Sequence, residues 1–388
     1  MKAFSMIVRN AFRHKLRTFL TILGIATAVM AFGLLRTIVD AWNYGVASSA
    51  ANRMIVRHRV SFIFPLPQAD RPQIAKLSGV KNVTWANWFG GVYGDPNDFT
   101  NFWPRFAVDP DTWFDVYPEF KPPADQLAAW AKERSACIIG AKIAAQHGFK
   151  IGDVITMEGD IFPGSWQFVV RGIYQGRDAT VDETQMFIHW QYLDEQVRQR
   201  EPGREVGAGW YVVQLSNPDD MPRVAGAIDG LFENSRAPTK TESERAFQQG
   251  FVSMSSAIIT SLQVISFVII GIILLVLANT IVMAVRERTR EYAVLKTLGY
   301  TGRHLATFIL GESLLIGVSG GVLGLVLTFP VVRGFGLALP TMFPVIQVTS
   351  TTIVLGLVLA VVCGLAAAAA PTLRAVRLSI VTGLRTVG

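Results

Sequence analysis

The sequence predicts a membrane protein with four transmembrane α-helices and a large α+β extracytoplasmic domain between helices 1 and 2. Of the 388 residues, 51% are hydrophobic and only 17% are charged, against about 25% charged in an ordinary soluble domain. Four mostly apolar runs are each long enough to cross a hydrocarbon layer of about 30 Å as a helix. This composition argues against a disordered chain and against a purely soluble enzyme.

The four apolar runs define the expected domain organisation. The segments are 1–17 (cytoplasmic amphipathic helix), 18–39 (first transmembrane helix), 40–256 (extracytoplasmic domain), 257–285 (second transmembrane helix), 286–303 (cytoplasmic helix and loop), 304–332 (third transmembrane helix), 333–351 (short outer loop), 352–370 (fourth transmembrane helix) and 371–388 (cytoplasmic tail).

The distribution of charge predicts the orientation. Segments 1–17, 286–303 and 371–388 together carry 13 basic and 2 acidic residues, whereas 40–256 carries 21 basic and 26 acidic residues. The positive-inside rule therefore places both termini and 286–303 in the cytoplasm. The net charge of +7 then reports membrane topology, and we expect no binding to nucleic acid.

The first segment has three interpretations. Its basic residues, the apolar run and Ala26-Thr27-Ala28 fit a cleaved signal peptide, and a simple charged anchor is a second possibility. Apolar residues at helical spacing favour the third, an amphipathic helix on the inner membrane surface. These residues are Phe4, Ile7, Val8, Ala11, Phe12 and Leu16.

The extracytoplasmic segment alternates strand and helix signals, which predicts an α+β domain with mostly antiparallel pairing. Asn217-Pro218-Asp219-Asp220 is expected to cap a helix that ends near Phe232. From about Glu242 the chain is expected to run as helix into the second span without a break. The expected strands are 53–60, 80–85, 154–157, 167–174 and 210–215, and a helix is expected over 141–147.

Residues 84–120 hold twelve aromatic side chains in 37 residues, interrupted by proline turns. Two interpretations are open. The rings can form the core of a loop-rich subdomain, or they can form an apolar surface for a lipidic or peptidic cargo or for a partner protein. The candidate residues of such a surface are Trp85, Trp88, Trp103 and Trp113.

The sequence lacks the common catalytic signatures. It has no phosphate-binding loop, no nucleophile elbow and no metal-ligand spacing among its five histidines. Cys137 and Cys363 fall in different compartments and are expected to be small packing residues. We therefore expect no catalytic, cofactor-binding or metal site in this chain. Glu312, inside the third span, is either a functional acid or the partner of a cytoplasmic Arg or Lys.

Segment 286–303 has no helix breaker before Gly299, and Tyr292, Leu295 and Leu298 are expected to share one helix face. The segment is either a charged stop-transfer loop or a short helix that docks in a groove of a partner protein. The expected docking residues are Arg286, Glu287, Arg290, Glu291, Tyr292, Leu295, Lys296, Leu298 and Gly299.

The third span contains two overlapping G-x-x-x-G pairs, Gly317/Gly321 and Gly320/Gly324. Glycine at this spacing lets helices approach closely in a membrane. The pairs are expected to serve helix packing, either within the chain or between subunits.

The 286–299 segment resembles the cytoplasmic segment of the FtsX-like permeases, the MacB, LolC/LolE and DevC group of ABC transporter membrane subunits. The resemblance extends to other parts of the chain in the same order. These parts are 12–25 at the first span, 139–155 in the outer domain, 311–324 in the third span and 369–377 after the fourth.

The resemblance implies a non-catalytic permease subunit in the bacterial inner membrane, forming a homo- or heterodimer with a second permease copy. A separate ABC ATPase subunit would hold ATP and magnesium and seat on 286–298. The spans would transmit its motion to the outer domain for export or extraction of lipid, lipoprotein or peptide, in some members with a periplasmic adaptor and an outer-membrane channel. The alternatives are FtsX-like signalling to a cell-wall hydrolase, LolC/LolE-like lipoprotein release, and a four-span receptor without an ATPase.

Overall fold

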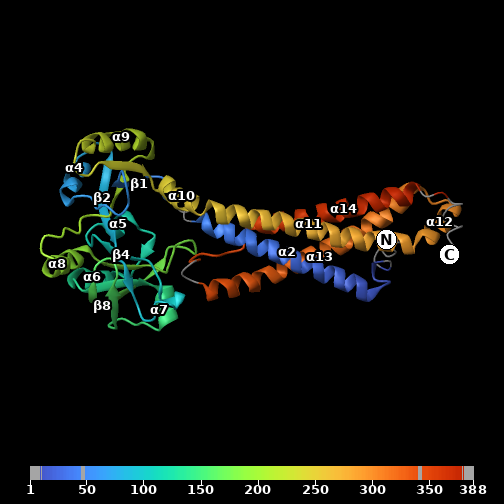
Figure 1. The fold of residues 1–388 in the computed structure, drawn as a ribbon, viewed down its shortest axis with the longest axis horizontal. Helices are drawn as coiled ribbons and strands as arrows, with labels where there is room; N and C mark the ends of the chain where they lie inside the picture. The colour runs from blue at the N-terminus through green and yellow to red at the C-terminus, as the bar shows by residue number, and fades with distance from the viewer. Residues whose placement is uncertain (1–8, 10, 45–48, 340–342, 378, 380–388) are drawn as a thin grey trace. The chain divides into compact units, whose positions relative to one another are not determined.

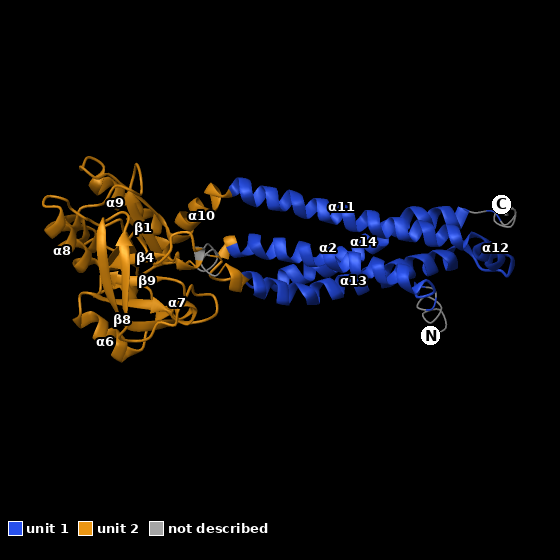
Figure 2. Ribbon diagram, turned by 60° about the horizontal axis from the view of Figure 1, so that its bottom comes forward, with its two compact units in different colours: residues 1–41, 256–335, 346–388 blue, residues 42–255, 336–345 orange. Residues whose placement is uncertain are grey.

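A computed structural model describes residues 9, 11–44, 49–339, 343–377 and 379. The chain divides into two compact units, which we describe separately (Figure 2). The helical unit comprises 1–41, 256–335 and 346–388, and the α/β unit comprises 42–255 and 336–345. Parts of the terminal segments expected at 1–17 and 371–388 lie outside the described residues.

The helical unit contains four long apolar helices that run along one another (Figures 1 and 2). Each has the length and hydropathy of a membrane span. A fifth, short helix, α12, lies between the second and third long helices. The helices are α2 (Lys15–Trp42), α11 (Ser256–Glu287), α12 (Thr289–Thr297), α13 (Gly302–Ala338) and α14 (Ser350–Arg377).

The long helices extend beyond the apolar runs. The longest, α13, has 37 residues and is about 55 Å long, which exceeds the hydrocarbon thickness of about 30 Å. Pro330 lies inside α13 and Pro371 inside α14. The added turns at the helix ends carry charged residues such as Arg17 and Arg374.

The two glycine pairs of α13 face different helices of the same chain. A Cβ atom on Gly320 would lie 2.7 Å from Ile25 Cβ of α2, and one on Gly324 would lie 2.5 Å from Ala26 O. On the other face, a Cβ atom on Gly321 would collide with Ala360 of α14. The glycines therefore let α2 and α14 both approach α13 closely.

The α/β unit is built on one mixed sheet in the order β11-β1-β10-β2-β4-β9-β6-β8-β7-β3, with β5 paired to β8. The pairs β4–β9 and β6–β8 are parallel, and the other pairs are antiparallel. The strands are β1 (Arg53–His58), β2 (Val80–Trp88), β3 (Gly91–Val92), β4 (Arg105–Val108), β5 (Phe120–Lys121), β6 (Ala136–Gly140), β7 (Val154–Gly159), β8 (Gly164–Gly176), β9 (Met186–His189), β10 (Trp210–Leu215) and β11 (Thr239–Ser243).

Helices cover both faces of this sheet, because successive strand residues point to opposite sides. Met54 and Val56 of β1 join a core with α4, α7, α8 and α9, whereas Ile55 joins a core with α5 and α6. The helices are α4 (Arg71–Ala75), α5 (Trp113–Val116), α6 (Ala124–Lys132), α7 (Ala141–His147), α8 (Trp190–Arg200), α9 (Met221–Phe232) and α10 (Glu244–Met254).

Two sequence predictions can be compared with the structure here: the cap at Asn217 and the unbroken helix from Glu242 into the second span. The side chain of Asn217 accepts a hydrogen bond from the backbone N–H of Asp219 and so caps the 3-10 turn Pro218–Asp220, which leads directly into α9. The predicted end at Phe232 is confirmed, but Asp220, the N-cap of α9 itself, makes no side-chain capping bond. The predicted unbroken helix from Glu242 into the second span is wrong. Ser255, with φ −94° and ψ 10°, separates α10 from α11, because serine side chains compete with the helical backbone for hydrogen bonds.

Candidate functional site

The candidate site is α12 and its surroundings at the basic end of the helical unit. The helix begins after Arg288, whose φ of −102° interrupts the run from α11. It ends at Thr297, and Gly299, two residues later, adopts a φ of +90°. The N–H of Tyr300 donates to Leu295 O and the N–H of Gly299 donates to Lys296 O, both at 3.1 Å. This Schellman motif satisfies the last carbonyls and gives α12 a defined end.

The inward face of α12 is formed by Tyr292 and Ala293, which are both buried. Tyr292 packs in the core of the helical unit with residues of α13 and α14, including Leu305 and Ala375. Burial, opposed by the charge of Arg288, raises the pKa of Tyr292 to about 12. This tyrosine therefore anchors α12 to the bundle, and it is not part of an exposed docking face.

A buried ion pair fixes the start of α12 to the third span. Arg288 Nη1 donates to Glu312 Oε2 at 2.7 Å, and the two side chains are 5% and 9% exposed. Of the two interpretations of Glu312, the structure shows the pairing with a basic residue. No sequence pattern indicated Arg288 as this partner, although it is one of the basic residues of segment 286–303.

Two exposed ion pairs connect the start of α2 to this region. Arg13 Nη1 lies 2.5 Å from Glu291 Oε1, and Arg17 Nη1 lies 2.8 Å from both carboxylate oxygens of Glu287. Exposed pairs of this kind contribute only about 0–1 kcal/mol each. They therefore affect the net charge at this end of the bundle more than they affect the stability of the bundle.

Other expected docking residues also have contacts within the chain. Leu295 is half-buried against the bundle core. Lys296 Nζ donates to Val376 O at 2.8 Å and so caps the end of α14. Gly299 supplies the helix stop described above. Arg286 is exposed and lines a pocket with α14.

The outward face of α12 shares only Leu298 with the predicted stripe of Tyr292, Leu295 and Leu298. Arg290 is exposed, Leu298 is 71% exposed and Val294 is 43% exposed. These residues recur every four positions and therefore lie along one side of the helix. We call Arg290, Val294 and Leu298 the outer face of α12. Val294 was not among the expected docking residues, although its spacing of four residues from Arg290 and from Leu298 places all three on one helix face.

The tryptophans expected at a cargo or partner surface are mostly in the core. Trp85, Trp103 and Trp113 are 7%, 1% and 4% exposed, whereas Trp88 is 38% exposed. Among the aromatic side chains that the structure describes in 84–120, only Trp88 and Phe102 are classed as exposed. This corrects the surface interpretation for three tryptophans. They are buried because they pack in the two cores of the α/β unit. Trp85 of β2 and Trp103, just before β4, belong to one core, and Trp113 of α5 belongs to the other.

A buried charge cluster joins the two ends of the α/β unit that continue into spans. Arg53 Nε donates to Glu244 Oε2 at 2.8 Å, and Arg53 Nη2 donates to Glu119 Oε1 at 2.6 Å. The guanidinium also lies 4.3 Å from the ring centroid of Tyr117. Arg53 begins β1, soon after α2, and Glu244 begins α10, just before α11. No sequence pattern indicated this cluster, because its members are far apart in the chain.

Among the residues that the structure describes, no group of three or more His, Cys, Asp or Glu side chains could hold a metal ion. Cys137 and Cys363 are both buried free thiols. The arrangement at α12 is that of an anchored helix with an exposed outer face, which suits protein recognition.

Comparisons with known proteins agree across most of the chain. Residues 18–231 match the model of the MacB-like periplasmic core domain, and residues 263–380 match that of the FtsX-like permease C-terminal region. An uncharacterized ABC transporter permease of Methanocaldococcus jannaschii is 23% identical over 342 residues, which cover 82% of this chain and 80% of that protein.

Two solved structures are similar to part of the chain. The periplasmic region of MacB from Actinobacillus actinomycetemcomitans is 12% identical, with a TM-score of 0.37, and the match covers 54% of this chain and 95% of that one. The extracellular domain of the noncanonical ABC-type transporter YknZ from Gram-positive bacteria is also 12% identical, with a TM-score of 0.36. That match covers 50% of this chain and 100% of that one.

Proposed function

Since the chain belongs to the MacB/FtsX-like family of ABC transporter permeases, we propose that it converts ATP hydrolysis by a separate subunit into movement of its α/β unit. Membership of this family implies an ATPase partner and a dimer, and a non-catalytic role in transport. ATP and magnesium are held by the partner. The four apolar helices make the chain a multi-pass membrane protein.

The outer face of α12 is the surface on which the ATPase seats. This proposal rests on one observation: α12 is anchored by Tyr292 and by the Arg288–Glu312 pair, yet Val294 and Leu298 are left exposed. Exposed apolar residues on a rigid helix, next to a charge such as Arg290, suit insertion into a groove of another protein. A stop-transfer loop would need neither the anchor nor the apolar outer face.

Motion passes from α12 to the α/β unit along α2 and α11. These helices have 28 and 32 residues. They act as stiff rods between the basic end of the helical unit and the α/β unit. At their outer ends, Arg53 and Glu244 belong to one buried cluster, which supports a joint that receives both helices. The termini and α12 are cytoplasmic, the α/β unit is periplasmic, and the membrane is the inner membrane of a bacterium.

The cargo is a lipid, a lipoprotein or a peptide, taken from the membrane or periplasm, in some systems with an adaptor and an outer-membrane channel. Two outcomes would favour other members of the family. A cell-wall hydrolase that co-purifies, without cargo-stimulated ATPase activity, would favour FtsX-like signalling. Lipoproteins trapped in the inner membrane after depletion would favour LolC/LolE-like release.

The test removes the apolar outer face. Val294→Asp and Leu298→Asp are introduced separately into the tagged full-length chain, and the ABC ATPase that co-purifies with the wild type is quantified. We expect each variant to lose about tenfold or more of the ATPase, as for a central interface residue. Leu231→Asp on α9, a leucine that is 47% exposed, is the matched control and should retain it. Full retention of the ATPase by both α12 variants would reject this seating surface.

A further inference from the structure

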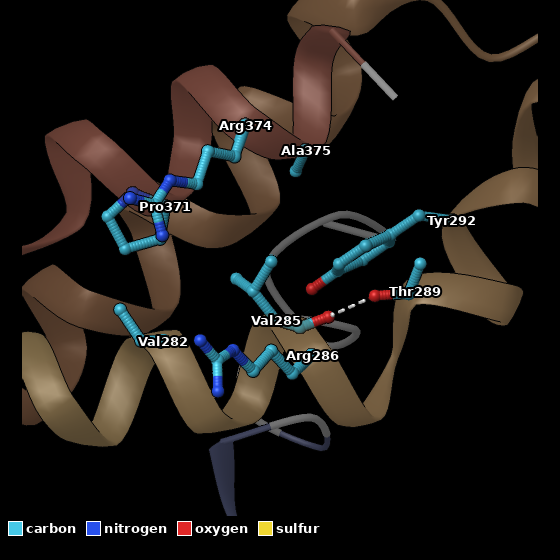
Figure 3. A pocket seen from close by; sticks show the side chains of 8 residues that line it. All are labelled: Val282, Val285, Arg286, Thr289, Tyr292, Pro371, Arg374 and Ala375. Carbon is cyan, nitrogen blue, oxygen red and sulfur yellow. Dashed lines mark hydrogen bonds between the residues drawn. The ribbon is translucent and has the colours of Figure 1, made fainter. Parts of the chain in front are cut away.

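A pocket opens between α11, α12 and α14 at the basic end of the helical unit (Figure 3). Its volume is about 120 Å³. Two arginines line it, Arg286 from α11 and Arg374 from α14, together with the apolar side chains of Val282, Val285 and Pro371. Figure 3 shows both arginine side chains extending toward the same side of the pocket, away from Tyr292.

The carboxylates at this end of the bundle form ion pairs with arginines other than Arg286 and Arg374. Glu287 pairs with Arg17, and Glu291 pairs with Arg13. Glu312 pairs with the buried Arg288. Segments 1–17 and 371–388 contain no acidic residue.

Consequently, Arg286 and Arg374 have no carboxylate counter-ion among the residues that the structure describes. Two guanidinium groups that line one pocket favour an anion there.

The pocket lies at the ends of two helices that have the length and hydropathy of membrane spans. Arg286 is the penultimate residue of α11, and Arg374 lies in the last turn of α14. Val282, Val285 and Pro371 precede them on the membrane side of the same helices. At the ends of transmembrane helices, the most abundant anions are the phosphates of lipid headgroups. Basic pockets between transmembrane helices bind such anionic headgroups.

We propose that this pocket binds the phosphate of an anionic phospholipid headgroup. Arg286 and Arg374 donate hydrogen bonds to the phosphate oxygens, since the planar guanidinium matches phosphate geometry. Val282, Val285 and Pro371 contact the glycerol and the first carbons of the acyl chains. The apolar wall favours a lipid over a free phosphate, which carries no apolar part.

This site goes beyond the proposed function, because it neither includes the outer face of α12 nor depends on an ATPase. Thr289, the first residue of α12, also lines the pocket. A bound lipid therefore contacts α11, α14 and the start of α12 together. Its headgroup would hold the short helix against the membrane surface.

The test measures lipid binding by the delipidated full-length chain, using native mass spectrometry in a neutral detergent. The probes are phosphatidylglycerol, phosphatidylcholine, glycerol 3-phosphate and inorganic phosphate. We expect the wild type to prefer phosphatidylglycerol over phosphatidylcholine. The variant Arg286→Gln/Arg374→Gln should lose about 30-fold in affinity for phosphatidylglycerol, from about 1 kcal/mol for each arginine.

Arg303→Gln is the matched control, because Arg303 is an exposed arginine at the same end of the bundle and does not line the pocket. It should retain the preference for phosphatidylglycerol. Melting in phosphatidylcholine reports whether each variant is folded. If the double variant is not folded, the single variant Arg374→Gln is used instead. It should lose about fivefold in affinity for phosphatidylglycerol.

Three results would overturn the proposal. Unchanged phosphatidylglycerol affinity in the folded arginine variants would show that the pocket does not bind the headgroup. An equal loss in Arg303→Gln would show general attraction to a basic surface. Inorganic phosphate or glycerol 3-phosphate binding as tightly as the lipid, with the same dependence on Arg286 and Arg374, would identify a site for a soluble anion instead.

Discussion

Among single residues, Arg288 and Glu312 make the buried contact that ties α12 to the third long helix. Both charges have left water, and their attraction compensates for that cost only while both are present. The contact thus holds α12 in one position relative to α13. The proposed seating of an ATPase on α12 requires such a fixed base, because a loosely held helix would move without moving the spans.

The first prediction concerns this pair. Arg288→Met alone should destabilise the chain by about 3 kcal/mol or more, because it leaves the Glu312 carboxylate buried without its partner. The double variant Arg288→Met/Glu312→Leu should recover most of that loss. Thermal unfolding in detergent measures both. Equal destabilisation by the single and double variants would show that the pair is not the source of the effect.

The second prediction concerns Asp70 in the α/β unit. This side chain is 7% exposed, its Oδ2 atom has no hydrogen-bond partner among the described residues, and burial raises its pKa to about 6. Below pH 4 the carboxyl is protonated in both folded and unfolded chains. Between about pH 4 and 6 the unfolded chain has released this proton and the folded chain still holds it, so the folded chain loses stability over this range. Above about pH 6 the folded chain holds a buried charge and the full loss is present.

Asp70→Asn removes this titration. The variant should be more stable than the wild type by ~1 kcal/mol near neutral pH, a value reduced for the partial access of solvent to the site. Near pH 4 the difference should vanish. Thermal unfolding of the full-length chain across this pH range is the measurement. A gain that stays constant with pH would contradict the assignment.

For the secondary-structure elements, the central features are α12 and α13. The outer face of α12 is set by Tyr292, which turns inward and leaves Val294 and Leu298 outward. Helix α13 is the core of the bundle, since Gly320 faces α2 and Gly321 faces α14. A helix with glycines on two sides can pack closely against two neighbours at once.

The third prediction tests this packing. Gly320→Ala should destabilise the bundle by about 1–3 kcal/mol, because the new methyl group overpacks against Ile25. Gly334→Ala in the same helix is the matched control, since a Cβ atom there would meet nothing within 4 Å. The control should be neutral or slightly stabilising, because alanine favours helix over glycine. Melting temperatures that respond equally would exclude a packing role for Gly320.

For the whole molecule, the chain combines the outer face of α12, which we propose as the seat of an ATPase, four long apolar helices and a folded α/β unit. The α/β unit is joined to the spans through β1 on one side and α10 on the other, and the Arg53 cluster links these two elements. The break at Ser255 separates α10 from α11. Ser255 therefore marks the boundary between α10 of the α/β unit and α11.

The fourth prediction is the topology. In a background with Cys137 and Cys363 replaced by alanine, single cysteines are introduced as Lys150→Cys in the α/β unit and Arg303→Cys near the start of α13. Both native positions are exposed. In intact cells a membrane-impermeant maleimide should label the first variant, and it should label the second only after permeabilisation. Labelling of both from the same side would refute the proposed orientation.

The sequence alone was enough to predict four apolar helices, an α+β domain between the first and second, and the family. Apolar run length, hydropathy and charge bias are local properties, so they can be read without knowing which segments meet. The glycine pairs and the helix stop at Gly299 were visible for the same reason.

Only the tertiary structure decided which side chains meet. Arg288 pairs with Glu312 of another helix, and Arg53 pairs with Glu119 and Glu244, which are distant from it in the sequence of the α/β unit. Periodicity predicted that α12 has an apolar side, but the packing of Tyr292 decided which side faces outward. Burial depends on neighbours that are distant in the chain, and no local pattern specifies them.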